Sequence, residues 1–406
     1  MKNILVITPY YEPDIGPSAP IFTMLCEALA KMGHDVTCIT TRPHYTSELH
    51  DQSGRLLPVL ERTKHNDVDL LKIGMPFRRG GGVLNRLMYQ TSFNIGALVA
   101  AMRVRKPQFC IIDGPVLWSG LSWLYWCRFR RVDYIYNQHD IFPDVAWRLG
   151  WLKKGKIFRA WDFVERTIYL GSKRVLVLGS SAKKLLVEKG IPSGQVETFP
   201  VPVNFRDVDA ESESPSDFKD KWGLNGKFVV FYGGNLGQSQ RTLELAEVAA
   251  KMRDKHGIHF VFVGEGDQRA ALEEYVETES LGNVSIFPFQ ERRLLFDMYR
   301  SFDCGIVPLN PEISGEIVPS KAVFMMAAGM PILAWVGGDC ELANVVRESE
   351  CGRVVSGDGD ELAAQILEWS EGGVQGERLA EAGSRYAREK FDIGNISKAI
   401  SAICQE

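Results

Sequence analysis

The chain has 406 residues, of which 45% are hydrophobic and 24% are charged. This composition is typical of a soluble globular protein, and the length is too great for one ordinary hydrophobic core, so two domains are expected. The longest uncharged stretches, such as residues 113–128, are too short to span a bilayer, and residues 4–7 are typical of a first strand and not of a signal peptide.

The net charge of −4 conceals a difference between the two halves of the chain. Residues 1–200 carry 27 basic and 17 acidic side chains, whereas residues 201–406 carry 20 and 34. A difference of this size suggests two domains with different binding partners.

Short apolar runs alternate with helical patterns through the first half of the chain. The predicted strands are 4–8, 35–40, 69–75, 109–113, 134–137 and 174–178, with helices at 20–32 and 84–105 among the patterns between them. These runs are continuous and do not alternate with polar residues, which predicts parallel strands buried on both faces.

The second half repeats this organisation. Its predicted strands are 228–232, 259–263, 284–287, 304–307, 331–335 and 353–355, and its helices include 242–255, 268–279, 294–301 and two closing segments near 375–390 and 393–404. We therefore expect two doubly wound α/β domains that face each other across a cleft. The expected domains are 1–203 and 204–390, and residues 391–406 form a final helix that could return to the first domain.

Ligands in such sheets bind beyond the carboxyl ends of the strands. In the first half, Gly16 follows the first strand and would let backbone approach a ligand beside a helix N-terminus, unless this is a plain strand–helix loop. His139 and Asp140 follow the fifth strand and can hydrogen-bond sugar hydroxyls or transfer a proton near neutral pH. The alternative for this pair is a helix cap beside a structural histidine.

In the second half, each candidate ligand position also follows a predicted strand. These positions are Gly234, Asn235, Gly237 and Arg241 after the first strand, Gly264, Glu265 and Gly266 after the second, and Phe289 and Gln290 after the third. The glycine loops are weak indicators of a phosphate site, Arg241 suits a diphosphate, and Phe289 could flank a planar base.

The run from Val318 to Gly329 is the most informative stretch. Pro319 suits a first helical turn, and Ser320 and Lys321 then lie where free backbone N–H groups and the helix dipole attract an anion. Glu316 adds a carboxylate, which is costly beside a phosphate unless it accepts hydrogen bonds from ligand hydroxyls. With the loops above, the run predicts a nucleoside diphosphate carrying a hydroxyl-rich group.

No metal site is predicted. The eight cysteines show no paired ligand spacing, and buried free thiols in a reducing cytoplasm are expected. Asp207 and Asp209 resemble a metal-binding pair, but they lie in the linker between the domains.

These motifs occur in an order that resembles the retaining GT-B glycosyltransferases of family 4, over essentially the whole chain. The matching stretches are the first strand with its Gly16 loop, Gly33-His-Asp-Val-Thr, His139-Asp140, Gly233–Gly237, Gly264–Gly266, Val318–Gly329 and Cys351-Gly-Arg-Val-Val. Four motifs resemble the branch that includes bacterial fucosyl- and N-acetylfucosaminyl-transferases of surface polysaccharides: Tyr10-Tyr-Glu-Pro, Asp140-Ile-Phe-Pro-Asp, Gly234-Asn-Leu-Gly and Val318-Pro-Ser-Lys.

The resemblance implies a hexosyl-type transferase (EC 2.4 class) that moves a sugar, with retention, from a nucleotide-sugar, in the first instance a UDP-sugar. His139 would orient the donor sugar, and Glu316 would contact it. Leaving-group charge would be met by Arg241, Lys321 and the helix N-terminus at Ser320, and no metal or other cofactor is expected.

The chain departs from the family at three positions. Asn235 and Gln240 stand where the family often has Arg and Lys, and Phe324 stands where it has a second glutamate. These departures favour one alternative, a non-catalytic partner protein of the same fold. A nucleotide-sugar epimerase of the same architecture is a second alternative, and it would need acid–base carboxylates in the cleft.

The basic first half is the expected acceptor side. Residues 77–86, 118–131 and 151–161 mix cations with aromatic or apolar residues, as in segments that lie on an anionic membrane. The cations expected there are Arg78, Arg79, Lys153, Lys154, Lys156 and Arg159. A lipid-linked saccharide or polysaccharide acceptor at the inner leaflet would fit, with the protein cytoplasmic and peripheral. A solvated basic face with buried aromatics is the alternative, and no nucleic-acid-reading fold is evident.

Overall fold

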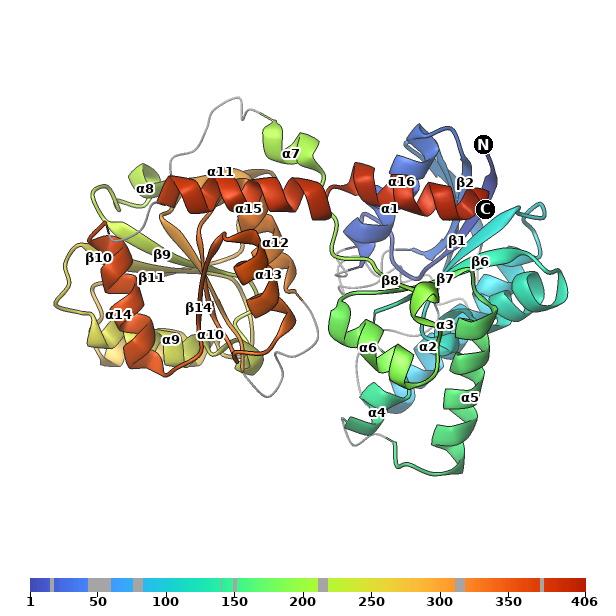
Figure 1. Ribbon diagram of the computed structural model, residues 1–406, viewed down its shortest axis with the longest axis horizontal. Helices are drawn as coiled ribbons and strands as arrows, with labels where there is room; N and C mark the ends of the chain where they lie inside the picture. The colour runs from blue at the N-terminus through green and yellow to red at the C-terminus, as the bar shows by residue number, and fades with distance from the viewer. Residues whose placement is uncertain are drawn as a thin grey trace. The chain divides into compact units, whose positions relative to one another are not determined.

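The computed structural model describes residues 1–14, 18–42, 60–75, 83–139, 141–148, 152–210, 218–310, 318–372 and 376–406. The chain forms two compact units: Met1–Pro202 together with Ile393–Glu406, and Val203–Asp392. Figure 1 shows each unit as a sheet with helices on both faces.

The sheet of the first unit has the strand order β3-β4-β2-β1-β5-β6-β7-β8. Its strands are β1 Asn3–Ile7, β2 Asp35–Thr41, β3 Leu60–His65, β4 Val68–Ile73, β5 Phe109–Asp113, β6 Asp133–Gln138, β7 Arg174–Val177 and β8 Val196–Thr198. All neighbours pair in parallel except β3 and β4, which are antiparallel.

Helices cover both faces of this sheet. They are α1 Ala19–Lys31, α2 Val83–Ala101, α3 Val116–Trp123, α4 Asp144–Arg148, α5 Lys156–Gly171, α6 Ser180–Glu188 and α16 Ile393–Gln405, with a π-helix at Leu124–Phe129 and a short 3₁₀ turn at Ser193–Gln195. Leu5 and Ile7 belong to the core that includes Phe93 of α2, whereas Ile4 and Val6 belong to the core that includes Phe22 of α1.

The helix α16, at the end of the chain, belongs to the first unit although α15 before it belongs to the second. It packs on α1, and Ile400, Ile403 and Cys404 are part of the core on that face (Figure 1). His34 Nε2 lies 2.7 Å from Ser401 Oγ, which adds a buried hydrogen bond to this packing.

The sheet of the second unit has the order β11-β10-β9-β12-β13-β14, and all its pairings are parallel. The strands are β9 Phe228–Gly233, β10 Ile258–Val263, β11 Val284–Phe287, β12 Cys304–Pro308, β13 Ile332–Trp335 and β14 Gly352–Val355. The helices are α7 Phe205–Asp209, α8 Phe218–Lys221, α9 Thr242–Lys251, α10 Arg269–Thr278, α11 Leu295–Ser301, α12 Ser320–Ala328, α13 Glu341–Ser349, α14 Gly359–Ser370 and α15 Gly376–Lys390, with 3₁₀ turns at Gln238–Gln240 and Arg292–Leu294.

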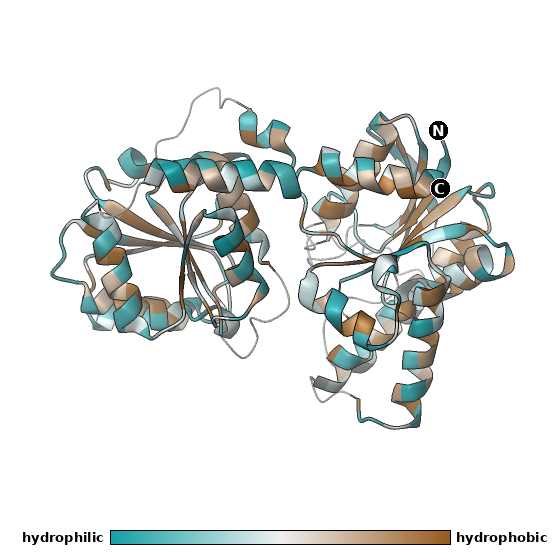
Figure 2. Ribbon diagram, viewed as in Figure 1, coloured by the Kyte–Doolittle hydropathy of each residue, from teal (hydrophilic) through white to brown (hydrophobic). Residues whose placement is uncertain are grey.

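The expected fold class of two doubly wound, mainly parallel α/β domains is confirmed. Figure 2 shows hydrophobic strands inside both units and helices that turn a hydrophilic side outwards. The strand β3 was not predicted, because its exposed and less exposed residues alternate at a sheet edge while the predicted strands are continuously apolar. All eight cysteines are buried free thiols, as expected.

Candidate active site

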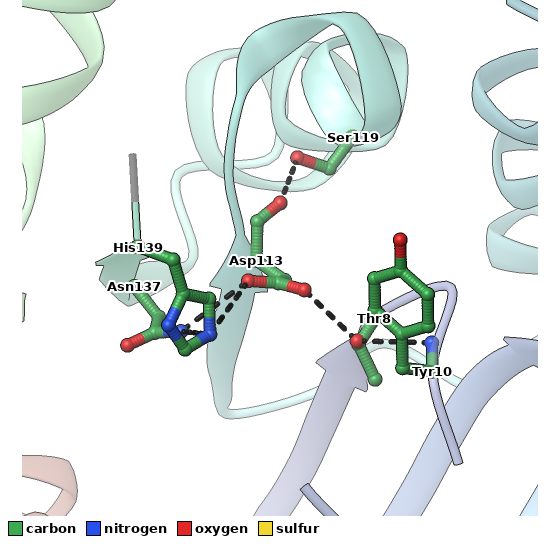
Figure 3. A network of polar contacts seen from close by, with 6 residues as sticks. All are labelled: Thr8, Tyr10, Asp113, Ser119, Asn137 and His139. Carbon is green, nitrogen blue, oxygen red and sulfur yellow. Dashed lines mark hydrogen bonds and ion pairs between the residues drawn. The ribbon is translucent and has the colours of Figure 1, made fainter. Parts of the chain in front are cut away.

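A buried polar network occupies the carboxyl edge of the first sheet, where β1, β5 and β6 are neighbours (Figure 3). Asp113 ends β5 and is fully buried. Its Oδ2 accepts a hydrogen bond from Thr8 Oγ1 at 2.9 Å, and its Oδ1 accepts one from Asn137 Nδ2 at 3.3 Å. Three strand ends that are far apart in the sequence therefore meet at one carboxylate.

His139 lies beside this network, just after β6. Its Nε2 is 2.9 Å from Asn137 Nδ2 and 3.8 Å from Asp113 Oδ1, and its side chain is 17% exposed. The ring of Phe22 meets the imidazole edge-to-face, with centroids 6.1 Å apart. Burial lowers the pKa of His139 to about 4, so the imidazole is neutral at physiological pH.

Lys321 is the central side chain of the second unit's candidate site, in the first turn of α12. Its Nζ donates to Gln240 Oε1 at 2.7 Å and to the Tyr232 hydroxyl at 3.0 Å, and it lies 4.1 Å from the centroid of the Tyr232 ring. Among the described residues no carboxylate pairs with it, and burial lowers its pKa to about 7.

The local sequence explains why α12 begins beside this lysine and ends where it does. Pro319 occupies the N-cap position with extended backbone, and no described side chain caps the first turn. Gly329 ends the helix in the left-handed conformation, with φ of 75°. The amide groups at Ser320 and Lys321 thus form a helix N-terminus with a cation in it.

The absence of a side chain at Gly234 leaves room for the side chain of Lys321. The φ of 137° at Gly234 is a conformation that L side chains rarely adopt, and a Cβ there would lie 3.1 Å from both Cε and Nζ of Lys321. The loop after β9 therefore requires glycine where it passes the lysine.

Gly264 and Gly266 have a packing role that their sequence does not reveal. A Cβ on Gly264 would lie 1.8 Å from the carbonyl oxygen of Gly234, and one on Gly266 would lie 2.2 Å from that of Leu236. Leu236 N donates to Glu265 O, so the loops after β9 and β10 are joined backbone to backbone. Gly237 is less restricted, because its Cβ would lie 2.7 Å from Nδ2 at the end of the Asn235 side chain, which can move.

Arg241 is held by its neighbours in the structure. Its guanidinium lies 3.4 Å from the centroid of the Trp335 ring, and its Nε and Nη2 donate to Glu244 Oε2 at 2.9 and 2.6 Å. Glu265 is paired in the same way with Arg269 Nη1, at 2.6 Å. Because the charge of Arg241 already has a carboxylate partner, Lys321 is the better candidate for contact with an anionic ligand.

The remaining predicted donor positions lie at the same edge of the second sheet. Phe289 is 57% exposed just after β11, and Gln290 Nε2 donates to Pro288 O. Phe324, named above as a departure from the family pattern, packs edge-to-face on Phe296, with ring centroids 6.3 Å apart. Five predicted site residues lie outside the described residues: Gly16, Arg78, Arg79, Asp140 and Glu316.

The predicted membrane cations Lys153, Lys154, Lys156 and Arg159 are all exposed. In the predicted segment 118–131, Trp123 and Trp126 are buried in the core, whereas Phe129 is 71% exposed. Exposed apolar side chains also lie on α5, where Ile157 and Phe163 are 71% and 70% exposed. Within the described ranges, no helix has the length and hydropathy that crossing a bilayer requires.

Sequence reasoning missed Thr8, Asp113, Asn137 and Tyr232. Each lies at or next to the carboxyl end of a predicted strand, so the rule that placed His139 could also have identified them. In the parts of the chain that the structure describes, no three His, Cys, Asp or Glu side chains gather as a metal site.

Two family models match the chain, one to each unit. Residues 18–202 match the model described as "Glycosyl transferase 4-like domain", and residues 227–371 match "Glycosyl transferases group 1". The chain belongs to family 4 of the GT-B glycosyltransferases.

A relative agrees with this family, and solved structures share the fold. The chain is 25% identical over 340 residues to the "Putative colanic acid biosynthesis glycosyl transferase WcaI" of Escherichia coli K12, which covers 80% of this chain and 81% of the relative. Sucrose-phosphate synthase from Thermosynechococcus elongatus has the same fold, with a TM-score of 0.74, 16% identity and coverage of 100% and 98%. HepE of Anabaena, solved in complex with UDP, has a TM-score of 0.71, 14% identity and coverage of 99% of both chains.

Proposed function

We propose that this glycosyltransferase moves a hexosyl group from a UDP-sugar, with retention, to a lipid-linked or polysaccharide acceptor in cell-surface glycan synthesis. The observation that carries the proposal is Lys321, a partly buried amine without a described carboxylate partner at the N-terminus of α12. The polysaccharide context is suggested by the name of the Escherichia coli relative, and the nucleotide by the UDP complex of HepE. The motifs from Tyr10 and Val318 keep the fucosyl- and N-acetylfucosaminyl-transferase branch as the proposed place within the family.

In this proposal the second unit stabilises the leaving group. As the bond between the anomeric carbon and the phosphate oxygen breaks, negative charge develops on the diphosphate. The Lys321 ammonium and the first-turn N–H groups of α12 meet that charge. The departing phosphate oxygen then accepts the proton that the acceptor hydroxyl loses, so no protein base is required.

The first test is UDP binding measured by calorimetry. Lys321→Ala should weaken UDP binding by about tenfold or more, because one buried charge-assisted contact is lost. Lys251→Ala is the matched control, since it removes an exposed lysine of the same unit that pairs with Asp360. Equal UDP affinity of Lys321→Ala and the wild type would refute the proposed site.

A non-catalytic nucleotide-binding protein is the second candidate, favoured by the packing of Phe324 on Phe296. The two candidates are distinguished by UDP release from UDP-sugars in the presence of a lipid-linked saccharide extract. Turnover that disappears in Lys321→Ala supports the transferase. UDP binding without turnover, for every sugar and extract tried, supports the non-catalytic protein.

We further propose that the outer face of α5 rests on an anionic membrane at the inner leaflet. Ile157, Phe163, Val164 and Leu170 are exposed. The seven-residue spacings align Ile157 with Val164 and Phe163 with Leu170, and the two pairs lie about 120° apart around the helix. Exposed Lys156, Arg159 and Arg166 lie on the same helix and would contact lipid phosphates.

Co-sedimentation with vesicles tests this surface. Wild-type protein should bind phosphatidylglycerol-containing vesicles and not pure phosphatidylcholine, and binding should fall with salt. Ile157→Ser with Phe163→Ser should weaken binding, whereas Phe289→Ser, which removes an exposed ring of the other unit, should not. Unchanged binding of the double variant would refute the surface.

A further inference from the structure

The role of His139 depends on which ring nitrogen carries its proton, because a neutral imidazole has one donor and one acceptor. We propose that Asp113 and Asn137 are positioning residues that hold His139 as the neutral tautomer with the proton on Nδ1. The tautomer is inferred from the contacts of the network alone. Its purpose, to offer an N–H donor to a sugar substrate, rests on the proposed function.

The Asn137 amide decides the tautomer. Its Nδ2 lies 3.3 Å from Asp113 Oδ1 and 2.9 Å from His139 Nε2, and it has two hydrogens, one for each contact. If Asn137 donates to Nε2, that nitrogen must accept, so the proton of the ring is on Nδ1. Figure 3 shows the Nε2 side of the imidazole turned towards Asp113 and Asn137.

Asp113 decides the orientation of the amide. An ionised carboxylate only accepts hydrogen bonds, so the opposite orientation would place the Asn137 carbonyl oxygen against it. The direction of the network agrees with this role: Tyr10 N donates to Thr8 Oγ1 at 3.2 Å, and that hydroxyl donates to Asp113. Thr8 therefore donates its hydroxyl hydrogen to the carboxylate, and Asn137 must likewise face the carboxylate with its amide N–H group.

Burial opposes the imidazolium form of the ring, and the carboxylate that would favour it makes no direct hydrogen bond to it, because Asp113 Oδ1 lies 3.8 Å from Nε2. Nε2 is occupied by the amide, and Nδ1–H cannot accept a proton. His139 thus acts as a hydrogen-bond donor to a substrate oxygen and not as a general base.

The direct test is NMR of the full chain with ¹⁵N-labelled histidine, using long-range proton–nitrogen correlations that distinguish the two tautomers. His139→Gln assigns the signal, and the other six histidines serve as internal controls. We expect His139 to show a protonated Nδ1 and an unprotonated Nε2 from pH 8 down to pH 5. A protonated Nε2 in the wild type would overturn the proposal, and this result does not depend on any enzymatic activity.

Two variants test the cause. Asn137→Asp replaces the donor by an acceptor, so the proton should move to Nε2 and the imidazolium should persist to higher pH. Asp113→Asn removes the carboxylate that orients the amide, so both tautomers should appear. An unchanged His139 spectrum in either folded variant would overturn the assigned roles, and if neither variant folds, the wild-type measurement still decides the tautomer.

Kinetic measurements distinguish a positioning role of Asn137 from a purely structural one. Where UDP-sugar turnover is measurable, Asn137→Asp should lower kcat by about 10² at neutral pH with little change in KM for the donor, because the N–H that meets substrate has moved. Its kcat should also acquire a pH dependence that the wild type lacks. A purely structural role would not move the pH profile. Absent turnover in the wild type would count against the proposed function and leave the NMR test intact.

Discussion

At the residue scale, the two candidate sites share a physical device, a titratable side chain kept neutral or nearly so by burial. The pKa of His139 is lowered to about 4 and that of Lys321 to about 7. Lys321 has no carboxylate partner among the described residues, and Asp113 Oδ1, 3.8 Å from His139 Nε2, makes no direct hydrogen bond to the imidazole. Both sites therefore suit a polar or anionic ligand that supplies a charge or hydrogen-bond partner.

The lowered pKa of Lys321 predicts that UDP binding takes up a proton. A bound diphosphate stabilises the ammonium and raises its pKa, so UDP affinity should fall as pH rises above about 7. Calorimetry in two buffers of different ionisation enthalpy at pH 8 should show proton uptake that approaches one per UDP. Lys321→Arg, which stays charged, should remove the uptake, and equal heats in both buffers for the wild type would contradict the prediction.

Glu165 of α5 predicts a second pH effect, on stability. It is fully buried, accepts hydrogen bonds from Val116 N, Trp161 Nε1 and the Tyr136 hydroxyl, and burial raises its pKa from 4.5 to about 7. Between these values the folded chain holds a proton that the unfolded chain has lost. The free energy of unfolding should therefore fall as pH rises from about 4.5 to 7, by up to about 3 kcal/mol.

Denaturant titrations of Glu165→Gln check this sign. The variant keeps a neutral amide at the site, so its stability should change less between pH 5 and 7 than that of the wild type. Glu188→Gln, at an exposed glutamate of the same unit, should leave the wild-type slope unchanged. A steeper slope in Glu165→Gln would show that the sign is wrong.

At the element scale, the loops after β9 and β10 form one joined structure beneath the candidate diphosphate site. Gly234 N donates to Val263 O, Leu236 N to Glu265 O and Gln268 N to Leu236 O, each at 2.9 Å. The strands β9 and β10 pair in register up to Gly233 and Val263, so these loops continue the backbone contact of the sheet.

Glycine substitutions measure how tight this contact is. Gly266→Ala places a Cβ 2.2 Å from the carbonyl oxygen of Leu236 and should cost about 1–3 kcal/mol of stability, with loss of UDP binding. Gly257→Ala is the control, because nothing lies within 4 Å of its Cβ. Equal melting temperatures for the two variants would mean that the loops accommodate the added methyl group at little cost in stability.

At the scale of the whole molecule, the first unit is completed by the last helix of the chain. Removal of residues 393–406 should expose Phe22, Leu25 and Ile4 of the core beneath α16. Hydrogen exchange in α1 and β1 should then accelerate strongly, whereas Ser401→Ala, which loses the hydrogen bonds of its hydroxyl to His34 and Gln405, should cost about 1 kcal/mol. Unchanged protection of α1 in the truncated chain would contradict this prediction.

The sequence predicted the sheets better than the sites. Strands such as β5 and β11 were found at their true bounds because continuous apolar runs identify buried parallel strands. The Asp113 network was missed because it depends on the order β1-β5-β6, which brings together residues more than a hundred positions apart. Lys321 was identified from its helix start, but its burial against Tyr232 and the stacking of Arg241 on Trp335 depend on side-chain packing that no local pattern records.

The return of α16 to the first unit has a consequence for synthesis on the ribosome. Met1–Pro202 leave the ribosome early, yet the segment that covers one face of their sheet is translated only after the whole of Val203–Asp392. During that interval the nascent first unit presents apolar side chains of β1 and α1. A ribosome that stalls before Ile393 would therefore yield a chain whose exposed apolar face chaperones and proteases can recognise, so the first unit is completed only after the second has been translated.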